Sequence, residues 1–241
     1  MRPILFSFFG EAIYSYPLLV GASWGLGYSL AKSNWIDKVG DEKKFNILFI
    51  GAFLSAWLGA KVFFLLFSMP EEQMRFAKEA SFWLGGGFVF YGGLIFGLLF
   101  MLLAMKLLSV KAIKLALFIP PLFIGHALGR VGCFLAGCCF GKQCSLSFIE
   151  HHPVQLYEAG FLVILYFTAN FLLNKKKSYE LTLLSYLWGY SLVRFFLELF
   201  RDDKIRGIHF GLSTSQWTSL ILFLFGTIFF ILFRRRERNS L

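Results

Sequence analysis

Residues 216–233 read QWTSLILFLFGTIFFILF, and the basic run RRR at 234–236 follows at once. The stretch contains no ionisable side chain. A helix that crosses a membrane needs about 20 predominantly apolar residues, and basic residues gather at its cytoplasmic end. This stretch therefore predicts a transmembrane helix.

The composition of the whole chain agrees with this prediction. Of the 241 residues, 57% are hydrophobic, 20% aromatic and only 16% charged. Soluble domains carry about 25% charged residues, so this chain lacks the side chains for a solvated shell. An ordinary soluble domain, a disordered chain and a coiled coil are excluded. The apolar stretches are continuous rather than alternating, which argues against an outer-membrane barrel.

Working outward from the last span, we identify seven stretches of this kind, and they predict an all-α polytopic membrane protein with a single transmembrane domain over residues 1–241. The fourth should end near Gly129 and Arg130 and border a cavity, because irregular backbone at membrane depth needs a cover of protein or water. The predicted spans are 12–31, 46–68, 86–105, 115–135, 156–174, 182–200 and 216–233.

The charges predict how these spans are oriented. The net charge of +10 does not indicate a nucleic-acid partner, because the basic residues lie in short clusters between the apolar stretches. Seven spans put the termini on opposite sides, and most basic residues then fall on the side of the C-terminus, which the positive-inside rule makes cytoplasmic. The N-terminus lies outside. Arg2 and the apolar run 3–9 resemble a signal peptide, but Glu11 interrupts the run, so we expect an uncleaved segment ahead of the first span.

Ionisable residues within apolar spans are costly and are candidates for function. Arg194 and Glu198 have the i,i+4 spacing that puts both on one helical face. They form either an ion pair that fixes helix packing or an anion site in which Glu198 orients Arg194. Arg130 is a second candidate phosphate ligand, or else a cation that extends to the membrane interface.

The segment 152–158, HPVQLYE, combines several polar side chains with the start of the fifth span. Pro153 and an acidic Glu158 are typical of a helix start, but they do not account for His152, Gln155 and Tyr157 as well. Two further polar residues stand out in earlier spans. Tyr16 could anchor at the interface, whereas the ammonium of Lys61 needs an anion or water.

All four cysteines lie between residues 133 and 144. They are Cys133, Cys138, Cys139 and Cys144. The predicted topology puts them on the outer side, where disulfides persist. Three interpretations stay open: disulfides or structural thiols, a reactive thiol, and a metal site. The spacing C-x4-C-C-x4-C does not match the common C-x2-C framework of zinc sites.

Four segments, in order, resemble the bacterial prolipoprotein diacylglyceryl transferase family. Residues 82–94, FWLGGGFVFYGGL, resemble its Gly-rich segment, and residues 129–141, GRVGCFLAGCCFG, resemble its signature. Residues 152–158 are similar to its His-Pro-x-Gln-Leu-Tyr-Glu motif, and residues 194–198, RFFLE, to its Arg-x3-Glu motif. Four motifs in this order, with seven spans, make a specific match over most of the chain.

The resemblance implies an enzyme that moves a diacylglyceryl group from phosphatidylglycerol to the lipobox cysteine of a prolipoprotein and releases glycerol phosphate. It implies no metal or organic cofactor, a bacterial cytoplasmic membrane, and helices around a lipid cavity open sideways to the bilayer. Arg130 and Arg194 would hold the phosphate, and Glu198 would orient Arg194. Tyr16 and Gly141 match the family's first-span Tyr and its signature Gly.

Four positions depart from the family. Tyr91 replaces the His of the Gly-rich segment, Cys133 and Ala136 replace two Asn residues of the signature, and Cys138 replaces an acid. Tyr is a poor base near neutral pH. Two alternatives therefore remain beside the leading interpretation. One is a homologue that uses phosphatidylglycerol with another acceptor, with Cys138 or Cys139 as a transient nucleophile. The other is a non-catalytic lipid-binding or thiol-redox membrane protein.

Overall fold

A computed structural model describes residues 3–8, 11–67, 82–83, 89–144, 150–175, 178–201 and 208–239, and these are predominantly helical. The helical elements are α1 (Ser15–Lys38), α2 (Glu42–Phe67), α4 (Phe90–Leu107), η2 (Ala112–Phe118), α5 (Ile119–Ala136), α6 (Val154–Asn174), α7 (Tyr179–Leu184), η3 (Ser185–Tyr190), α8 (Ser191–Leu197), η4 (Glu198–Phe200) and α9 (Thr214–Asn239). Of these, η2 and η4 are 3-10 helices and η3 is a π-helix.

The helices confirm the predicted fold class. Each of the seven predicted spans overlaps a helical segment, and in the described residues five of these segments are long and apolar enough to cross a membrane. Large apolar side chains stay exposed along them, such as Phe167 and Ile221, each 63% exposed. A predominantly helical chain that exposes such side chains is a multi-pass membrane protein. The lateral lipid cavity and the orientation of the termini stay predictions.

The N-terminal segment forms a hairpin ahead of the first helix. Strands β1 (Ile4–Phe8) and β2 (Glu11–Tyr14) pair antiparallel, and the backbone N–H of Ser15 donates to the carbonyl of Pro3 at 2.9 Å. The first span was expected to begin at residue 12, but strand pairing occupies residues 12–14 and delays α1 to Ser15. A second short hairpin joins β3 (Ile208–His209) to β4 (Leu212–Ser213).

The break expected near Gly129 and Arg130 in the fourth span is not formed, although α5 ends within one residue of the predicted limit at 135. The two glycines at 129 and 132 are accommodated within α5, which continues to Ala136. The helix ends at Gly137, whose φ of 79° lies in the left-handed region that glycine adopts without strain. Arg130 therefore projects from the body of a helix and not from its end.

The chain divides into two compact units, residues 1–34 with 115–241, and residues 35–114. The second unit is built on α2 and α4, which cross at two glycines. A Cβ atom on Gly59 would lie 2.5 Å from the carbonyl oxygen of Gly92, and one on Gly92 would lie 2.3 Å from that of Gly59. Small residues permit this approach between membrane helices.

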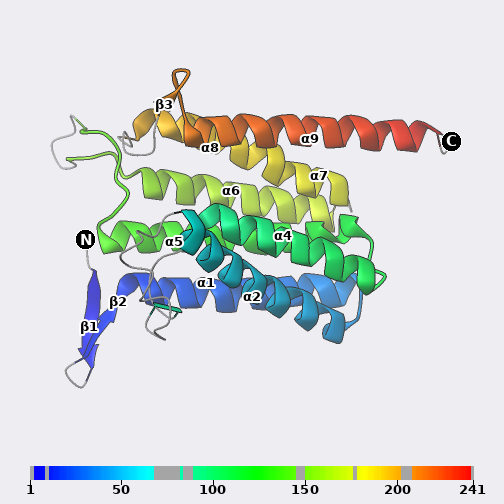
Figure 1. Cartoon of the computed structure of the whole chain (residues 1–241), viewed down its shortest axis with the longest axis horizontal. Coiled ribbons are helices and arrows are strands. Elements are labelled where there is room, and N and C mark those ends of the chain that lie inside the picture. Colours follow the sequence, from blue (N-terminus) through cyan, green and yellow to red (C-terminus); the bar gives the residue numbers. More distant parts are fainter. Residues whose placement is uncertain are drawn as a thin grey trace. The chain divides into compact units, whose positions relative to one another are not determined.

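In the first unit, α5 packs along α6 and α8 packs along α9, as Figure 1 shows. The core between α5 and α6 contains Phe123, Ala127, Ala159 and Leu162. Over residues 179–200, which contain the predicted span 182–200, the regular helix is interrupted by η3. Such π segments are frequent at functional sites. Together these helices carry the polar cluster described next.

Candidate active site

The buried carboxylate of Glu158 is the centre of a charged network between α5, α6 and α8. Its side chain is 1% exposed. Its Oε2 atom lies 3.0 Å from Nε of Arg130 on α5 and 3.9 Å from Nη1 of Arg194 on α8. The hydroxyl of Tyr190 donates to Oε1 at 3.0 Å, and Nε2 of His126 lies 3.6 Å from that atom. The carboxylate of Glu158 thus lies between the guanidinium groups of Arg130 and Arg194.

Arg194 is held from a second side. Its Nη2 atom lies 2.9 Å from Oε2 of Glu198, one helical turn further on, and donates to Oγ of Ser215 on α9 at 2.9 Å. Glu198 also lies 3.9 Å from Nε of Arg201. The i,i+4 pair predicted from the sequence is therefore formed, and α9 adds a hydroxyl that fixes the same guanidinium.

We call Arg130, Glu158, Arg194, Glu198 and Arg201 the arginine–glutamate network. Among the described residues, Arg130 and Arg194 lie within 4 Å of Glu158, and Arg194 and Arg201 lie within 4 Å of Glu198. Every member has a side chain that is less than one-fifth exposed. Planar guanidinium groups bind phosphate through paired hydrogen bonds. The network is thus suited to an anionic group.

Spacing along α5 and α6 explains how the network is built. His126 and Arg130 are one turn apart on α5, and Tyr190 and Arg194 are one turn apart across the end of η3. Glu158 lies in the second turn of α6, which begins at Val154 and has no acid in its first turn. The interpretation of Glu158 as an acid placed for the helix dipole is therefore wrong.

The loop after α5 lies against the start of α6. The side-chain amide of Gln155 donates to the carbonyl of Cys138, and the backbone N–H of Gly141 donates to the carbonyl of His152 at 2.9 Å. A Cβ on Gly141 would lie 2.3 Å from the carbonyl oxygen of Phe200, so glycine is required by this close approach. His152 also lies 3.4 Å from the hydroxyl of Tyr157. These residues shape the loop beside the network.

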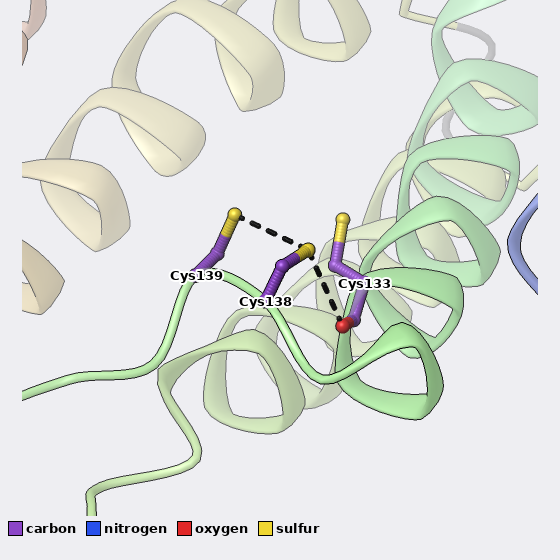
Figure 2. A group of neighbouring side chains, drawn as sticks. All are labelled: Cys133, Cys138 and Cys139. Carbon is purple, nitrogen blue, oxygen red and sulfur yellow. Dashed lines mark hydrogen bonds between the residues drawn. The ribbon is translucent and has the colours of Figure 1, made fainter. Parts of the chain in front are cut away.

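Three of the four cysteines gather at the end of α5, as Figure 2 shows. The sulfur atoms of Cys133, Cys138 and Cys139 all lie within 4.8 Å of one another, and those of Cys138 and Cys139 are 3.6 Å apart. Cys144 is not in this group. All four are free thiols, so the structure forms none of the disulfides that the sequence left open.

The thiols differ in their acidity. A hydrogen bond with the Cys133 thiol lowers the pKa of Cys139 to about 5, and the positive charges of Arg201 and Arg130 act in the same direction. Burial raises the pKa of Cys138. Cys139 has a φ of 65°, in the left-handed region, where a non-glycine residue costs roughly 1–2 kcal/mol. Such strain is frequent at functional sites.

Tyr16 reaches the same end of α5. A Cβ on Gly132 would lie 3.3 Å from Cδ2 of Tyr16, so the ring packs on this glycine next to Cys133. The ring is 45% exposed. The first-span tyrosine therefore lies beside the thiols.

Two predicted site residues belong to the second unit and are described by themselves. Lys61 is fully buried, its ammonium donates to the carbonyl of Phe82, and it lies 4.4 Å from the centre of that ring. A carbonyl and an aromatic face are thus among the contacts of this cation, and its need for an anion or water stays a prediction. Tyr91 is 42% exposed on α4.

Comparison with known proteins shows the family of this chain. The sequence profile of the family described as "Prolipoprotein diacylglyceryl transferase" matches residues 3–232. The chain belongs to this family. The family match covers all the site residues named above, from Tyr16 to Ser215.

Curated relatives agree. The phosphatidylglycerol–prolipoprotein diacylglyceryl transferase of Clostridium tetani is 31% identical, over 99% of this chain and 100% of the relative. The enzyme numbered 2 of that name in Clostridium perfringens is 29% identical, over 100% of this chain and 98% of the relative. The one from Bordetella avium is 32% identical over 78% of this chain and 76% of the relative. The chain is a transferase of this family.

Four residues of the site were not predicted from the sequence. His126, Tyr190 and Arg201 each lie three or four residues from a predicted site residue, so a search for polar neighbours one helical turn away could have found them. Ser215 lies on another helix, and no signal in the sequence links it to Arg194.

Proposed function

We propose that the chain transfers a diacylglyceryl group from phosphatidylglycerol to the lipobox cysteine thiol of prolipoproteins and releases glycerol phosphate. The observation that carries the proposal is the arginine–glutamate network, in which the guanidinium groups of Arg130 and Arg194 are fixed on either side of Glu158 among membrane helices. The phosphate of the donor lipid is an anion that such guanidinium groups bind.

The reaction needs a group that stabilises a departing phosphate. A thiolate attacks a glyceryl carbon, the bond from this carbon to the phosphate oxygen breaks, and glycerol phosphate leaves with both negative charges. Arg130 and Arg194 are already fixed by Glu158 and Glu198, so they need little reorganisation when this charge develops. Preorganised donors of this kind contribute strongly to catalysis.

The remaining residues of the first unit are assigned more general roles in substrate binding. Tyr16 packs on Gly132 beside the thiols, and Gln155 and Gly141 join the loop after α5 to the start of α6. His152 and Tyr157 pack beside that loop. We assign these residues to binding of the two substrates. A role for Lys61 in substrate binding and one for Tyr91 in catalysis remain predictions from the sequence.

We further propose that the protein resides in the bacterial cytoplasmic membrane, with its N-terminus outside and its C-terminus in the cytoplasm. The basic segment at the end of α9 supports this orientation. In this orientation, the thiols lie toward the outer side, where a translocated lipobox cysteine arrives. Donor lipid would enter from the bilayer through a lateral opening.

One alternative keeps the donor but changes the acceptor. Cys138 is exposed and stands where the family carries an acid, which favours a route through a transient thioether on the enzyme. Under that route, Cys138→Ser abolishes product formation in reducing buffer. Under our proposal, Cys138→Ser lowers transfer without abolishing it, because no bond to Cys138 forms during the reaction.

The test is transfer by the purified, reduced protein in detergent, with phosphatidylglycerol and a lipobox peptide, followed by mass spectrometry of the peptide thioether. Arg130→Gln and Arg194→Gln should each lower the rate by at least about a hundredfold, the scale on which one transition-state donor acts. Arg235→Gln, at an exposed arginine near the end of α9, is the matched control and should leave the rate unchanged. Undiminished transfer by the Arg130→Gln, Arg194→Gln double variant would overturn the proposal.

A further inference from the structure

The three thiols at the end of α5 have the geometry of a metal site. A tetrahedral zinc ion holds thiolates at about 2.3 Å, which separates neighbouring sulfur atoms by about 3.8 Å. The sulfurs of Cys138 and Cys139 are already 3.6 Å apart, and all three lie within 4.8 Å of one another. Side-chain movements of under about 1 Å would bring all three onto one ion.

The backbone directs these side chains together. Successive residues of an extended chain point in opposite directions, so neighbouring cysteines do not ordinarily share a ligand. Here Gly137 and Cys139 both adopt left-handed conformations, and the N–H of Cys138 donates back to the carbonyl of Cys133 at 3.1 Å. Gln155 holds the carbonyl of Cys138 from α6. Two helices thus fix a loop that turns both vicinal thiols toward Cys133, as Figure 2 shows.

The number and exposure of the thiols indicate which kind of site this is. Structural zinc sites are closed by four protein ligands, whereas catalytic ones use three and leave one position for water or substrate. The cluster offers three sulfur ligands, Cys138 is exposed, and the other two are partly exposed. A substrate group can therefore reach the fourth position. Thiolate ligands select soft ions such as zinc.

We propose that Cys133, Cys138 and Cys139 bind a Zn²⁺ ion whose fourth position takes the acceptor thiol. The inference rests on the proposed function, since it supplies the thiolate that diacylglyceryl transfer consumes. The thiol loses its proton to solvent when it binds the ion. The sulfur electron pair then forms the bond to the glyceryl carbon, and the pair of the broken carbon–oxygen bond leaves on glycerol phosphate.

The site lies where this role requires it. Cys133 follows Arg130 by three residues on α5, so the thiols lie about one turn from the guanidinium assigned to the donor phosphate. Nucleophile and leaving group would be held by neighbouring turns of one helix. Cys133 and Cys138 are also two of the four departures from the family pattern, so this device would distinguish the present chain from members that carry Asn and an acid there.

The first experiment measures metal binding without reference to activity. The full chain is purified in detergent with a phosphine reductant, supplied with Zn²⁺ or Co²⁺, and washed before elemental analysis and absorption spectroscopy. We expect one ion per chain and a thiolate-to-cobalt charge-transfer band. Loss of an outer-shell partner alone lowers metal affinity by about 10- to 100-fold, so Cys133→Ser, Cys138→Ser and Cys139→Ser should each lower it by at least about tenfold. Cys144→Ser, outside the cluster, is the matched control.

The second experiment tests the acceptor position. A lipobox peptide should shift the cobalt spectrum toward that of four thiolates, and the same peptide with Ser in place of Cys should not. Removal of the ion by a chelator should lower transfer at least about tenfold, and Zn²⁺ should restore it, because a ligand that keeps the thiol deprotonated is lost.

Several results would overturn the inference. They are less than stoichiometric metal in the reduced wild type, a copper ion in place of zinc, a disulfide between two cluster cysteines, and equal loss of binding in Cys144→Ser. An unchanged cobalt spectrum with the Cys peptide would overturn the acceptor role. Full transfer by the chelated protein would overturn the metal's part and leave the proposed function standing. A protein that binds metal and peptide but transfers nothing would overturn the proposed function alone.

Discussion

The carboxylate of Glu158 should be essential because it separates two buried guanidinium groups. Glu158→Gln keeps the shape of the side chain and removes its charge. At the observed 3.0 Å, the attraction to Nε of Arg130 is about 5.5 kcal/mol for an effective dielectric constant of 20. The pair with Arg194 at 3.9 Å adds about 4 kcal/mol on the same basis.

Desolvation offsets part of this attraction. Breaking a buried ion pair from one side costs about 3–5 kcal/mol in practice, and this is the loss in the free energy of unfolding that we expect for Glu158→Gln. Arg130→Gln should cost a similar amount, because it leaves the same carboxylate under-compensated. The double variant should cost about 2 kcal/mol less than the sum, since the partner of each removed charge is also gone.

The assay is reversible unfolding in mixed micelles of a mild detergent and dodecyl sulfate, followed by tryptophan fluorescence. Glu150→Gln makes the same chemical change at an exposed glutamate and should stay within about 0.5 kcal/mol of wild type. If Glu158→Gln also stays within that range, or if the two single changes add to within about 0.5 kcal/mol, the central place of Glu158 in the network is refuted.

Substitutions at two closely packed glycines and at Ser215 test two backbone approaches and one hydrogen bond. Gly141→Ala and Gly92→Ala each put a Cβ 2.3 Å from a backbone carbonyl oxygen, so each should lower the unfolding midpoint in mixed micelles, whereas Gly160→Ala, with no neighbour within 4 Å, should leave it equal or higher. Equal unfolding midpoints for the three glycine variants would contradict the close backbone approaches at Gly141 and Gly92. Ser215→Ala removes a hydrogen bond of about 1.5–3 kcal/mol to Arg194; kcat should fall about tenfold or more with KM little changed, and Ser215→Thr should restore it.

Much of the fold could be predicted because hydrophobic length alone determines where helices cross a membrane. The predicted spans overlap the helices, although their edges shift where local bonding intervenes. Strand pairing delays α1 to Ser15, and α5 continues past Gly129 until the left-handed Gly137 ends it. Neither of these two helix limits can be predicted from hydropathy.

The site was predictable only where it is local in sequence. The pair of Arg194 with Glu198 follows from helical spacing and is formed. The contacts of Glu158 with Arg130 and Arg194 depend on how α5, α6 and α8 pack, and single-helix periodicity carries no information on that register. The gathering of the thiols likewise depends on the backbone conformation of Cys139, which the spacing of the cysteines does not specify.

Transfer stoichiometry tests the central claim most directly. The reduced wild-type protein is placed in liposomes of phosphatidylglycerol labelled in both its diacylglyceryl and its glycerol phosphate parts, with a lipobox peptide carrying either Cys or Ser. The account predicts equal molar amounts of peptide thioether and free glycerol phosphate with the Cys peptide, and neither with the Ser peptide. Glycerol phosphate without thioether, or no product while an active family member reacts in parallel, would contradict it.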